Sequence, residues 1–311
     1  MNDTFYYKYS DYLKQKYGTK VYKLPVNLPL TCPNRCGGQQ GCTFCADIGT
    51  GFEPLSNEIS VQAQLLKNKA YIGSKYHVNK FIAYFQNYTN TYMPLDIFKS
   101  RMEEAAAVED IVEIAVSTRP DCIKDSYLDF LEDLSSRTGI RIHIELGLQT
   151  VNYHTLDDIC RGHGLAEFID SVLRIHRHPF TVCAHLILNL PQDTIRDTIE
   201  SSKIISVLPV DVVKLHSLYI ARHSAMGRAY EQGQLQICSK EEYMERLKTF
   251  LEYLNPTIAV ERLFSRIPEK DALFSNWQTS WWKLNDEFSK MMASCRSRQG
   301  IRYNYTNGPK L

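Results

Sequence analysis

Four cysteines lie close together near the beginning of the chain. Cys32, Cys36, Cys42 and Cys45 fall within 14 residues, whereas the whole chain of 311 residues holds nine cysteines. Even scattering would place fewer than one cysteine in a stretch of that length, so the clustering needs a cause. Thiolates are the ligands that select zinc or iron–sulfur clusters in proteins. These four residues therefore indicate a metal site.

The cysteines could also form a structural zinc site or a redox dithiol, or could be unrelated residues of one loop. A structural zinc site usually has two C-x-x-C pairs, and here only Cys42 and Cys45 form such a pair. A redox dithiol would use the same two residues. A cluster held by three cysteines accounts better for the count, because a catalytic metal centre keeps one coordination position open.

Apolar, β-branched runs alternate with longer amphipathic segments along the chain. This alternation is typical of parallel strands covered by helices, and six or seven such units predict an α/β fold, a full or partial βα barrel. The expected strands are Val21–Val26, Lys80–Gln86, Ile111–Ser117, Ile140–Leu146, Thr181–Leu190, Val212–Leu218 and Thr257–Leu263. The expected helices are Ser60–Ser74, Pro94–Ala107, Asp125–Arg137, Ala166–Arg177, Asp193–Leu208 and Lys240–Leu254. Chemistry in such barrels sits at the carboxyl ends of the strands, and the cysteines directly follow the first one.

The chain divides into three expected segments. Residues 1–19 form an amino-terminal extension, residues 20–263 the core barrel and residues 264–311 a carboxyl-terminal extension. The last segment contains Trp277, Trp281 and Trp282, followed by a basic tail.

The composition limits the classes of partner. The formal net charge is +1 and 44% of the residues are hydrophobic, which excludes a strongly basic protein that coats nucleic acid. We expect no DNA partner, although a local basic patch would still suit a structured RNA. The first residues show no secretory signal, and the longest apolar runs are too short to span a bilayer. The sequence thus predicts a cytoplasmic protein with reduced cysteines and no membrane partner.

The spacing Cys32-x9-Cys42-x2-Cys45 is similar to the cluster motif of the elongator-catalytic-subunit-like branch of radical SAM enzymes. The surrounding residues, from Lys23 to Arg35, resemble the bacterial YhcC/YtqA group of that branch, and the likeness extends over roughly residues 5 to 305. The resemblance implies a partial (β/α)6 TIM-like barrel of the radical SAM type with a [4Fe–4S] cluster on these three cysteines. It also implies S-adenosyl-L-methionine (SAM), which the cluster cleaves reductively to a 5′-deoxyadenosyl radical, and an external one-electron donor of flavodoxin or ferredoxin type.

Cys36 departs from the pattern of this group, which often has another residue at that position. A fourth thiolate would close the cluster and block SAM. We therefore expect Cys36 to be a bystander and Cys32, Cys42 and Cys45 to be the metal ligands.

The resemblance also implies which residues bind SAM. Phe44 corresponds to an aromatic residue that packs near adenine, and Gln86 with residues 88–90 stands where the class holds the methionyl amine. Glu145 and Gln149 are expected to bond the ribose hydroxyls, and Arg161 the SAM carboxylate. The complete expected set is Phe44, Gln86, Arg119, Glu145, Gln149, Arg161 and Asn189.

Structural roles are open alternatives for several of these residues. Phe44 could anchor the loop, and Arg119 could form an ion pair with Asp121. Lys214 and His216 lie near the end of the sixth expected strand and are candidates for contact with the substrate.

By resemblance the leading substrate is tRNA, at its wobble uridine. The basic tail and the aromatic residues of the last segment could provide phosphate contacts and stacking surfaces, or could simply cap the barrel. A radical enzyme acting on a small metabolite or a protein is one alternative. A non-catalytic Fe–S or zinc scaffold is another.

Overall fold

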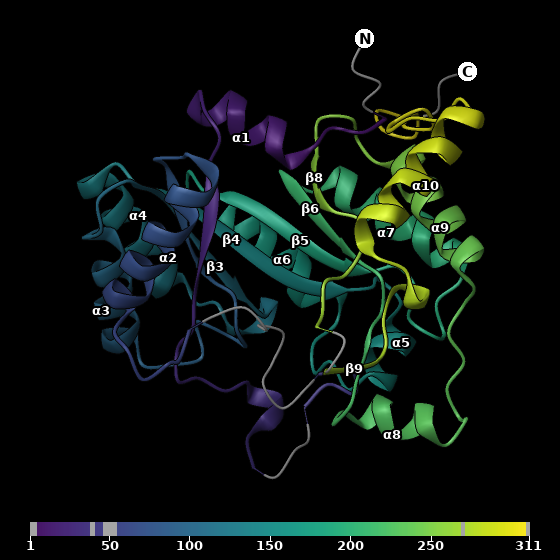
Figure 1. Cartoon of the computed structure of the whole chain (residues 1–311), viewed down its shortest axis with the longest axis horizontal. Helices are drawn as coiled ribbons and strands as arrows, with labels where there is room; N and C mark the ends of the chain where they lie inside the picture. Colours follow the sequence, from purple (N-terminus) through teal and green to yellow (C-terminus); the bar gives the residue numbers. More distant parts are fainter. Residues whose placement is uncertain (1–4, 38–40, 46–54, 269–270, 309–311) are drawn as a thin grey trace.

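The computed structural model describes residues 5–37, 41–45, 55–268 and 271–308. Seven parallel strands form one curled sheet with the order β1-β2-β3-β4-β5-β6-β8 (Figure 1). Strands β1 and β8 are the two edges of this sheet, so it is an open half-barrel. The strands are β1 (Tyr22–Val26), β2 (Phe81–Phe85), β3 (Ile111–Thr118), β4 (Arg141–Gln149), β5 (Thr181–Ile187), β6 (Val212–His216) and β8 (Ala259–Arg262).

Amphipathic helices cover the convex face of the sheet. In α4, for example, Tyr127, Leu131 and Leu134 share one face and are buried in the main core with the outward side chains of the strands. The covering helices are α2 (Val61–Tyr76), α3 (Leu95–Ala106), α4 (Asp125–Thr138), α6 (Leu165–Ile175), α7 (Ile195–Val207) and α9 (Lys240–Tyr253). The core therefore lies between sheet and helices, as in other α/β proteins.

Helix α1 (Tyr9–Tyr17) closes the amino-terminal end of the half-barrel. Tyr9 and Leu13 are buried against side chains inside the barrel. Lys16 Nζ donates to Glu113 Oε2 at 2.7 Å, and His143 Nδ1 lies 3.1 Å from Glu113 Oε1. Burial would raise the pKa of Glu113, but His143 and Lys16 outweigh it and lower the pKa to about 2. A buried ionic cluster thus fixes α1 to the sheet.

Smaller elements gather at the opposite end, where the strands end (Figure 1). They include the short helices α5 (Tyr153–Asp158) and α8 (Ala225–Glu231) and a two-stranded antiparallel sheet of β7 (Ile220–Ala221) and β9 (Ala272–Phe274). Helix α10 (Trp281–Ser294) returns to the main core through Leu284, Phe288 and Met292. The two short helices and the small sheet build the rim around the carboxyl ends, whereas α10 lies beside α7 and α9 (Figure 1).

The predicted half-barrel is confirmed. All seven expected strands are present, with boundaries within a few residues of those expected. The periodicity did not indicate α8, α10 or the small sheet of β7 and β9. The three expected segments remain a prediction. In the described part of the chain, no helix has both the length and the apolar character needed to cross a membrane.

Candidate active site

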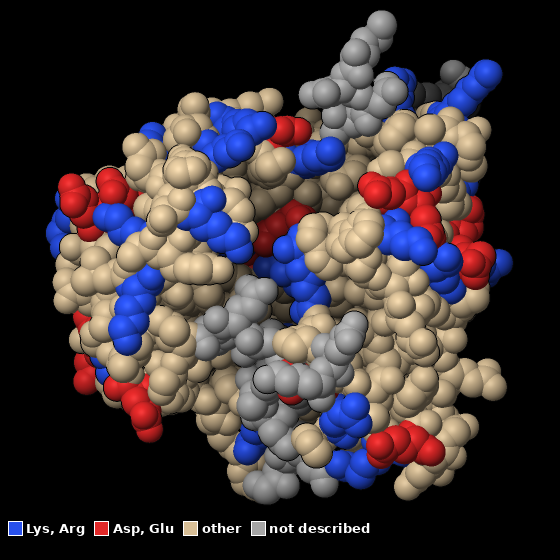
Figure 2. Space-filling model, in the orientation of Figure 1, with Lys and Arg blue, Asp and Glu red and all other residues tan. Residues whose placement is uncertain are grey.

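A large cavity opens at the carboxyl ends of the strands. Its volume is about 950 Å³, and it is lined by the cysteine loop, by the ends of the strands and by the segment that follows β8. Figure 2 shows a hollow on the viewed face, with acidic atoms deep inside and Lys and Arg atoms at its edge. Pockets of about 300–1,000 Å³ are usual for ligands of cofactor size, so this cavity is large enough for one.

The cysteine loop forms one wall of the cavity. Cys32, Cys42 and Cys45 line it. The 3₁₀ turn η1 (Pro33–Arg35) begins the loop, and the carbonyl of Asn34 accepts from the amide of Gly41 at 2.8 Å. Gly41 has a φ of +82°, and a Cβ there would approach the Arg35 side chain to 3.0 Å. Glycine at this position therefore allows the tight turn that brings Cys42 toward Cys32.

Hydrogen-bond donors converge on the sulfur of Cys32. Thr89 Oγ1 lies 3.4 Å and Arg119 Nη1 lies 3.8 Å from Cys32 Sγ. Asp121 holds Arg119 through bonds of 2.9 Å and 2.6 Å, so the ion pair weighed as an alternative is present. The same guanidinium donates to the carbonyl of Gly162 at 3.1 Å. The hydroxyl and the guanidinium are thus positioned to donate to this sulfur if it binds a metal.

The sulfur of Cys42 has a similar environment. Asn34 Nδ2 lies 3.4 Å and Arg161 Nη1 lies 3.6 Å from Cys42 Sγ. Asn34 Nδ2 also donates to the carbonyls of Cys160 and Arg161 at 2.8 Å, and Arg161 Nη2 donates to the carbonyl of Gly147 at 2.8 Å. The donors are therefore held in place by backbone.

The sulfurs of Cys45 and Cys36 have different surroundings. Burial raises the pKa of the Cys45 thiol, and the Arg35 guanidinium beside it opposes that rise. Cys36 Sγ instead lies 3.6 Å from the carbonyl of Cys32 and 3.6 Å from the hydroxyl of Tyr92. It does not belong to the lining of the cavity. The loop thus separates Cys36 from the other three cysteines.

Glu145 is the centre of a buried charge network inside the barrel. Lys23 Nζ donates to Glu145 Oε1 at 2.6 Å, Tyr84 Oη donates to Oε2 at 2.8 Å, and His185 Nε2 lies 2.7 Å from Oε2. Lys214 Nζ approaches Oε2 at 3.4 Å. Burial would raise the pKa of Glu145, but the charges of Lys214 and Lys23 hold it well below its usual range. The carboxylate is therefore ionised.

Glu261 completes this network. Its Oε2 lies 2.8 Å from Lys23 Nζ and its Oε1 3.2 Å from Lys214 Nζ. Two lysines and two glutamates therefore balance one another in charge. Glu145, His143 and Cys183 also place ligand atoms within 4.8 Å of one another. The two ammonium groups already on this network oppose a third cation, so these side chains form a charge network rather than a metal site.

The other expected cofactor residues divide into two groups. Phe44, Gln86, Gln149 and Arg161 line the cavity, as do Arg119 and Glu145. Phe44 is also buried in a small apolar cluster, so it anchors its loop. Asn189 is buried away from the cavity, and its Oδ1 accepts from the amide of Leu218 at 2.6 Å. Direct contact of each residue with SAM stays a prediction.

Sequence reasoning missed several residues of the cavity. Lys214 and His216 were expected and line it, but His185, Arg262 and Tyr84 were not singled out. Alternation along the strands could have identified His185, since it shares a face with Cys183 and lies two residues along from it. Arg262 could not be found that way because β8 contains an irregular register.

The comparison with known families decides the identity of the fold. Residues 28–204 match the radical SAM superfamily, and residues 210–294 match its C-terminal domain. The chain belongs to the radical SAM superfamily. It is a radical SAM enzyme, and members of this family generally require an external electron donor.

Two curated bacterial proteins match most of the chain, and a more distant protein matches about half of it. The uncharacterized protein YtqA of Bacillus subtilis is 31% identical over 95% of this chain and 92% of its own length. The protein YhcC of Escherichia coli is 31% identical over 87% of this chain and 86% of its own length. Elongator complex protein 3 of Homo sapiens is 24% identical over 56% of this chain and 31% of its own length.

A solved radical SAM structure has the same fold. The archaeal Methanocaldococcus infernus Elp3 superposes with a TM-score of 0.68 over 93% of this chain and 68% of its own, at 17% identity. The family implies a [4Fe–4S] cluster and SAM. The cavity fits both, since three cysteines face it and cationic or polar donors surround their sulfurs.

Proposed function

We propose that this protein binds a [4Fe–4S] cluster through Cys32, Cys42 and Cys45 and uses it to cleave SAM. The observation that carries this proposal is the division within the loop: three sulfurs line the cavity, and the fourth lies outside it. In the described residues these three sulfurs do not all come within 4.8 Å of one another, as the ligands of a single ion would. An iron–sulfur cluster, which is larger than a single ion, suits that spacing. With three cysteine ligands, one iron of the cluster would keep an open coordination position.

When bound and reduced, such a cluster would supply the electron for the reductive cleavage of SAM to methionine and a 5′-deoxyadenosyl radical, which would take a hydrogen atom from the substrate. Arg119 and Arg161 lie beside the cysteine sulfurs, and Arg161 would pair with the SAM carboxylate in a charge-assisted bond. Gln86 and Gln149 line the cavity, which supports the proposed contacts with the methionyl amine and the ribose.

We further propose that the substrate is tRNA, at its wobble uridine. The elongator-like branch that the sequence resembles carries out this kind of modification. Six arginine and lysine side chains and a single carboxylate line the cavity among the described residues, which suits an anionic polymer. A flavodoxin or ferredoxin would supply the electron, and the protein would act in the cytoplasm.

Nucleoside mass spectrometry of tRNA tests the substrate. A deletion strain should lack one wobble-uridine side chain or accumulate its precursor. The wild-type gene and the Cys36→Ala variant should restore the modification, whereas Cys42→Ala should not. Unchanged wobble nucleosides in the deletion strain would contradict tRNA as the substrate and favour a small metabolite or a protein.

A further inference from the structure

Arg262 is a cation in the lining of the cavity that has no polar partner among the described residues. Arg262 ends β8 and lines the cavity. No side chain or backbone group in the described part of the chain forms a hydrogen bond or ion pair with its guanidinium. A partly buried arginine without a partner is costly, since its desolvation is not repaid. Such a residue suits a site that an anionic ligand completes.

A register shift directs Arg262 into the cavity. Val213 pairs with Val260, and Lys214 pairs with Arg262, so the chain of β8 holds one extra residue, Glu261, at this point. In a regular strand, Glu261 and Arg262 would point to opposite faces. The irregularity lets both face the interior, with Glu261 in the charge network and Arg262 nearer the opening.

The neighbouring charges do not neutralise Arg262. Lys23 and Lys214 are balanced by Glu145 and Glu261. Burial lowers the pKa of His185 below its usual value, and Glu145 only partly opposes this. Burial and the Arg262 charge lower the pKa of His216 well below its usual value. Both imidazoles are therefore neutral near pH 7. The positive charge of Arg262 is thus not neutralised by the side chains around it.

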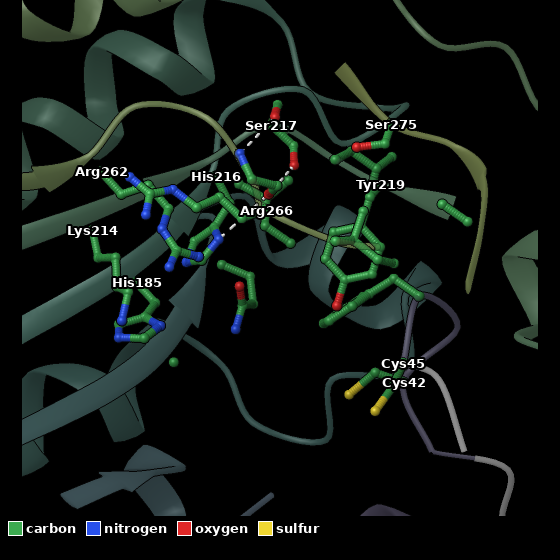
Figure 3. Close-up of a pocket in the computed structure, with 18 of the residues that line it drawn as sticks. Cys42, Cys45, His185, Lys214, His216, Ser217, Tyr219, Arg262, Arg266 and Ser275 are labelled. Atoms are coloured by element: carbon green, nitrogen blue, oxygen red, sulfur yellow. Dashed lines mark hydrogen bonds between the residues drawn. The ribbon is translucent and has the colours of Figure 1, made fainter. Parts of the chain in front are cut away.

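Arg262 and its neighbours His216 and Lys214 lie apart from the cysteines. Figure 3 shows Cys42 and Cys45 on one side of the cavity, and Arg262, His216 and Lys214 on the other. The guanidinium groups beside the cysteine sulfurs belong to Arg35, Arg119 and Arg161. Arg262 is thus left for a second ligand.

We propose that Arg262 binds a monoanionic oxyanion of the second substrate, either a carboxylate or a phosphodiester. The guanidinium fork would donate to both oxygens, and neutral His216 lies beside it in the cavity lining. Tyr230, Phe274 and Trp281 line the same cavity and offer apolar surface for the body of the substrate. This inference rests on the proposed radical SAM function but does not require tRNA.

Thermal unfolding with small anions tests the proposal directly. The reconstituted full-length protein is titrated anaerobically with sodium acetate or sodium dimethyl phosphate, with sodium chloride keeping the ionic strength constant. At least one anion should raise the Tm of the wild type saturably, because a ligand that binds the folded state stabilises it. A response to acetate identifies a carboxylate site, and a response to dimethyl phosphate a phosphodiester site.

Three variants make this test specific. Arg262→Gln should weaken the apparent anion affinity by about tenfold or more, since a charge-assisted bidentate contact is lost. Arg262→Lys should retain part of the response. Arg298→Gln, which removes an exposed arginine outside the cavity, should behave like the wild type.

Two results would overturn the proposal. One is an equal response, or no response, to both anions in the wild type and Arg262→Gln. The other is a loss of SAM affinity in Arg262→Gln, which would assign this arginine to the SAM carboxylate. Neither readout uses tRNA, so the proposal can hold even if wobble nucleosides do not change in a deletion strain.

Discussion

At the scale of single residues, the surroundings of each sulfur distinguish the cysteines. Cys32 and Cys42 each receive an arginine and one other donor, whereas Cys36 contacts a carbonyl and a tyrosine hydroxyl. Cys36→Ala should therefore keep the iron content and the absorption spectrum of a [4Fe–4S] cluster. Cys42→Ala should lose both. Iron analysis and visible spectroscopy after anaerobic reconstitution check this, and equal loss in the two variants would make Cys36 a ligand.

The buried carboxylate of Glu145 gives a second prediction at this scale. Glu145→Gln leaves Lys23 and Lys214 buried with half of their counter-charge, so the free energy of unfolding should fall by about 3–5 kcal/mol. The matched control is Glu103→Gln, which breaks an exposed ion pair with Arg137 and should cost less than about 1 kcal/mol. Denaturant unfolding measures both. Equal losses would show that the central network contributes no more than a surface pair.

At the scale of elements, the link between α1 and β3 predicts a dependence on pH. The pKa of Glu113 is about 2 in the folded protein, below its ordinary value of 4.5. This carboxylate therefore stabilises the fold above pH 4.5, and the stabilisation is lost as the pH falls toward 2. The difference corresponds to about 3 kcal/mol. Glu113→Gln should be less stable at neutral pH and should lose less stability in this acidic range. An unchanged acid profile would contradict this role.

The loop after α5 allows a matched pair of glycine variants. Gly162 and Gly139 both have a φ of +75°, so alanine should strain either backbone, at a cost of about 1 kcal/mol. A Cβ on Gly162 would also lie 2.5 Å from Asn34 Oδ1, whereas one on Gly139 would meet no atom within 4 Å. Gly162→Ala should therefore also reduce iron uptake, because Asn34 supports the cysteine loop. Equal iron content in both variants would remove this link.

The helices and strands were largely predictable from the sequence, whereas the side chains that line the cavity were less so. Strands and covering helices follow from periodicity, because a buried parallel strand is apolar throughout. The residues of the charge network around Glu145 come from several strands, so no local sequence pattern predicts it. Arg262 depends on an irregularity in β8 that neighbouring residues do not signal. The three cysteines were visible because one loop holds them all.

At the scale of the whole molecule, the basic lining of the cavity predicts how tRNA should bind. Binding in a gel-shift assay should weaken steeply as salt increases, since phosphate contacts release counterions. Arg266→Gln, at the rim of the cavity, should reduce both the affinity and the salt dependence, whereas Arg177→Gln, at an exposed position outside the cavity and the basic tail, should change neither. Binding that does not respond to salt would contradict an electrostatic tRNA surface.

The central claim is that three cysteines hold a cluster that cleaves SAM. The most direct measurement is mass spectrometry of 5′-deoxyadenosine after anaerobic incubation of the reconstituted protein with SAM and dithionite. The wild type and Cys36→Ala should form 5′-deoxyadenosine, and Cys42→Ala should form none. Stoichiometric zinc without iron uptake, or a complete cluster that yields no 5′-deoxyadenosine, would contradict the claim.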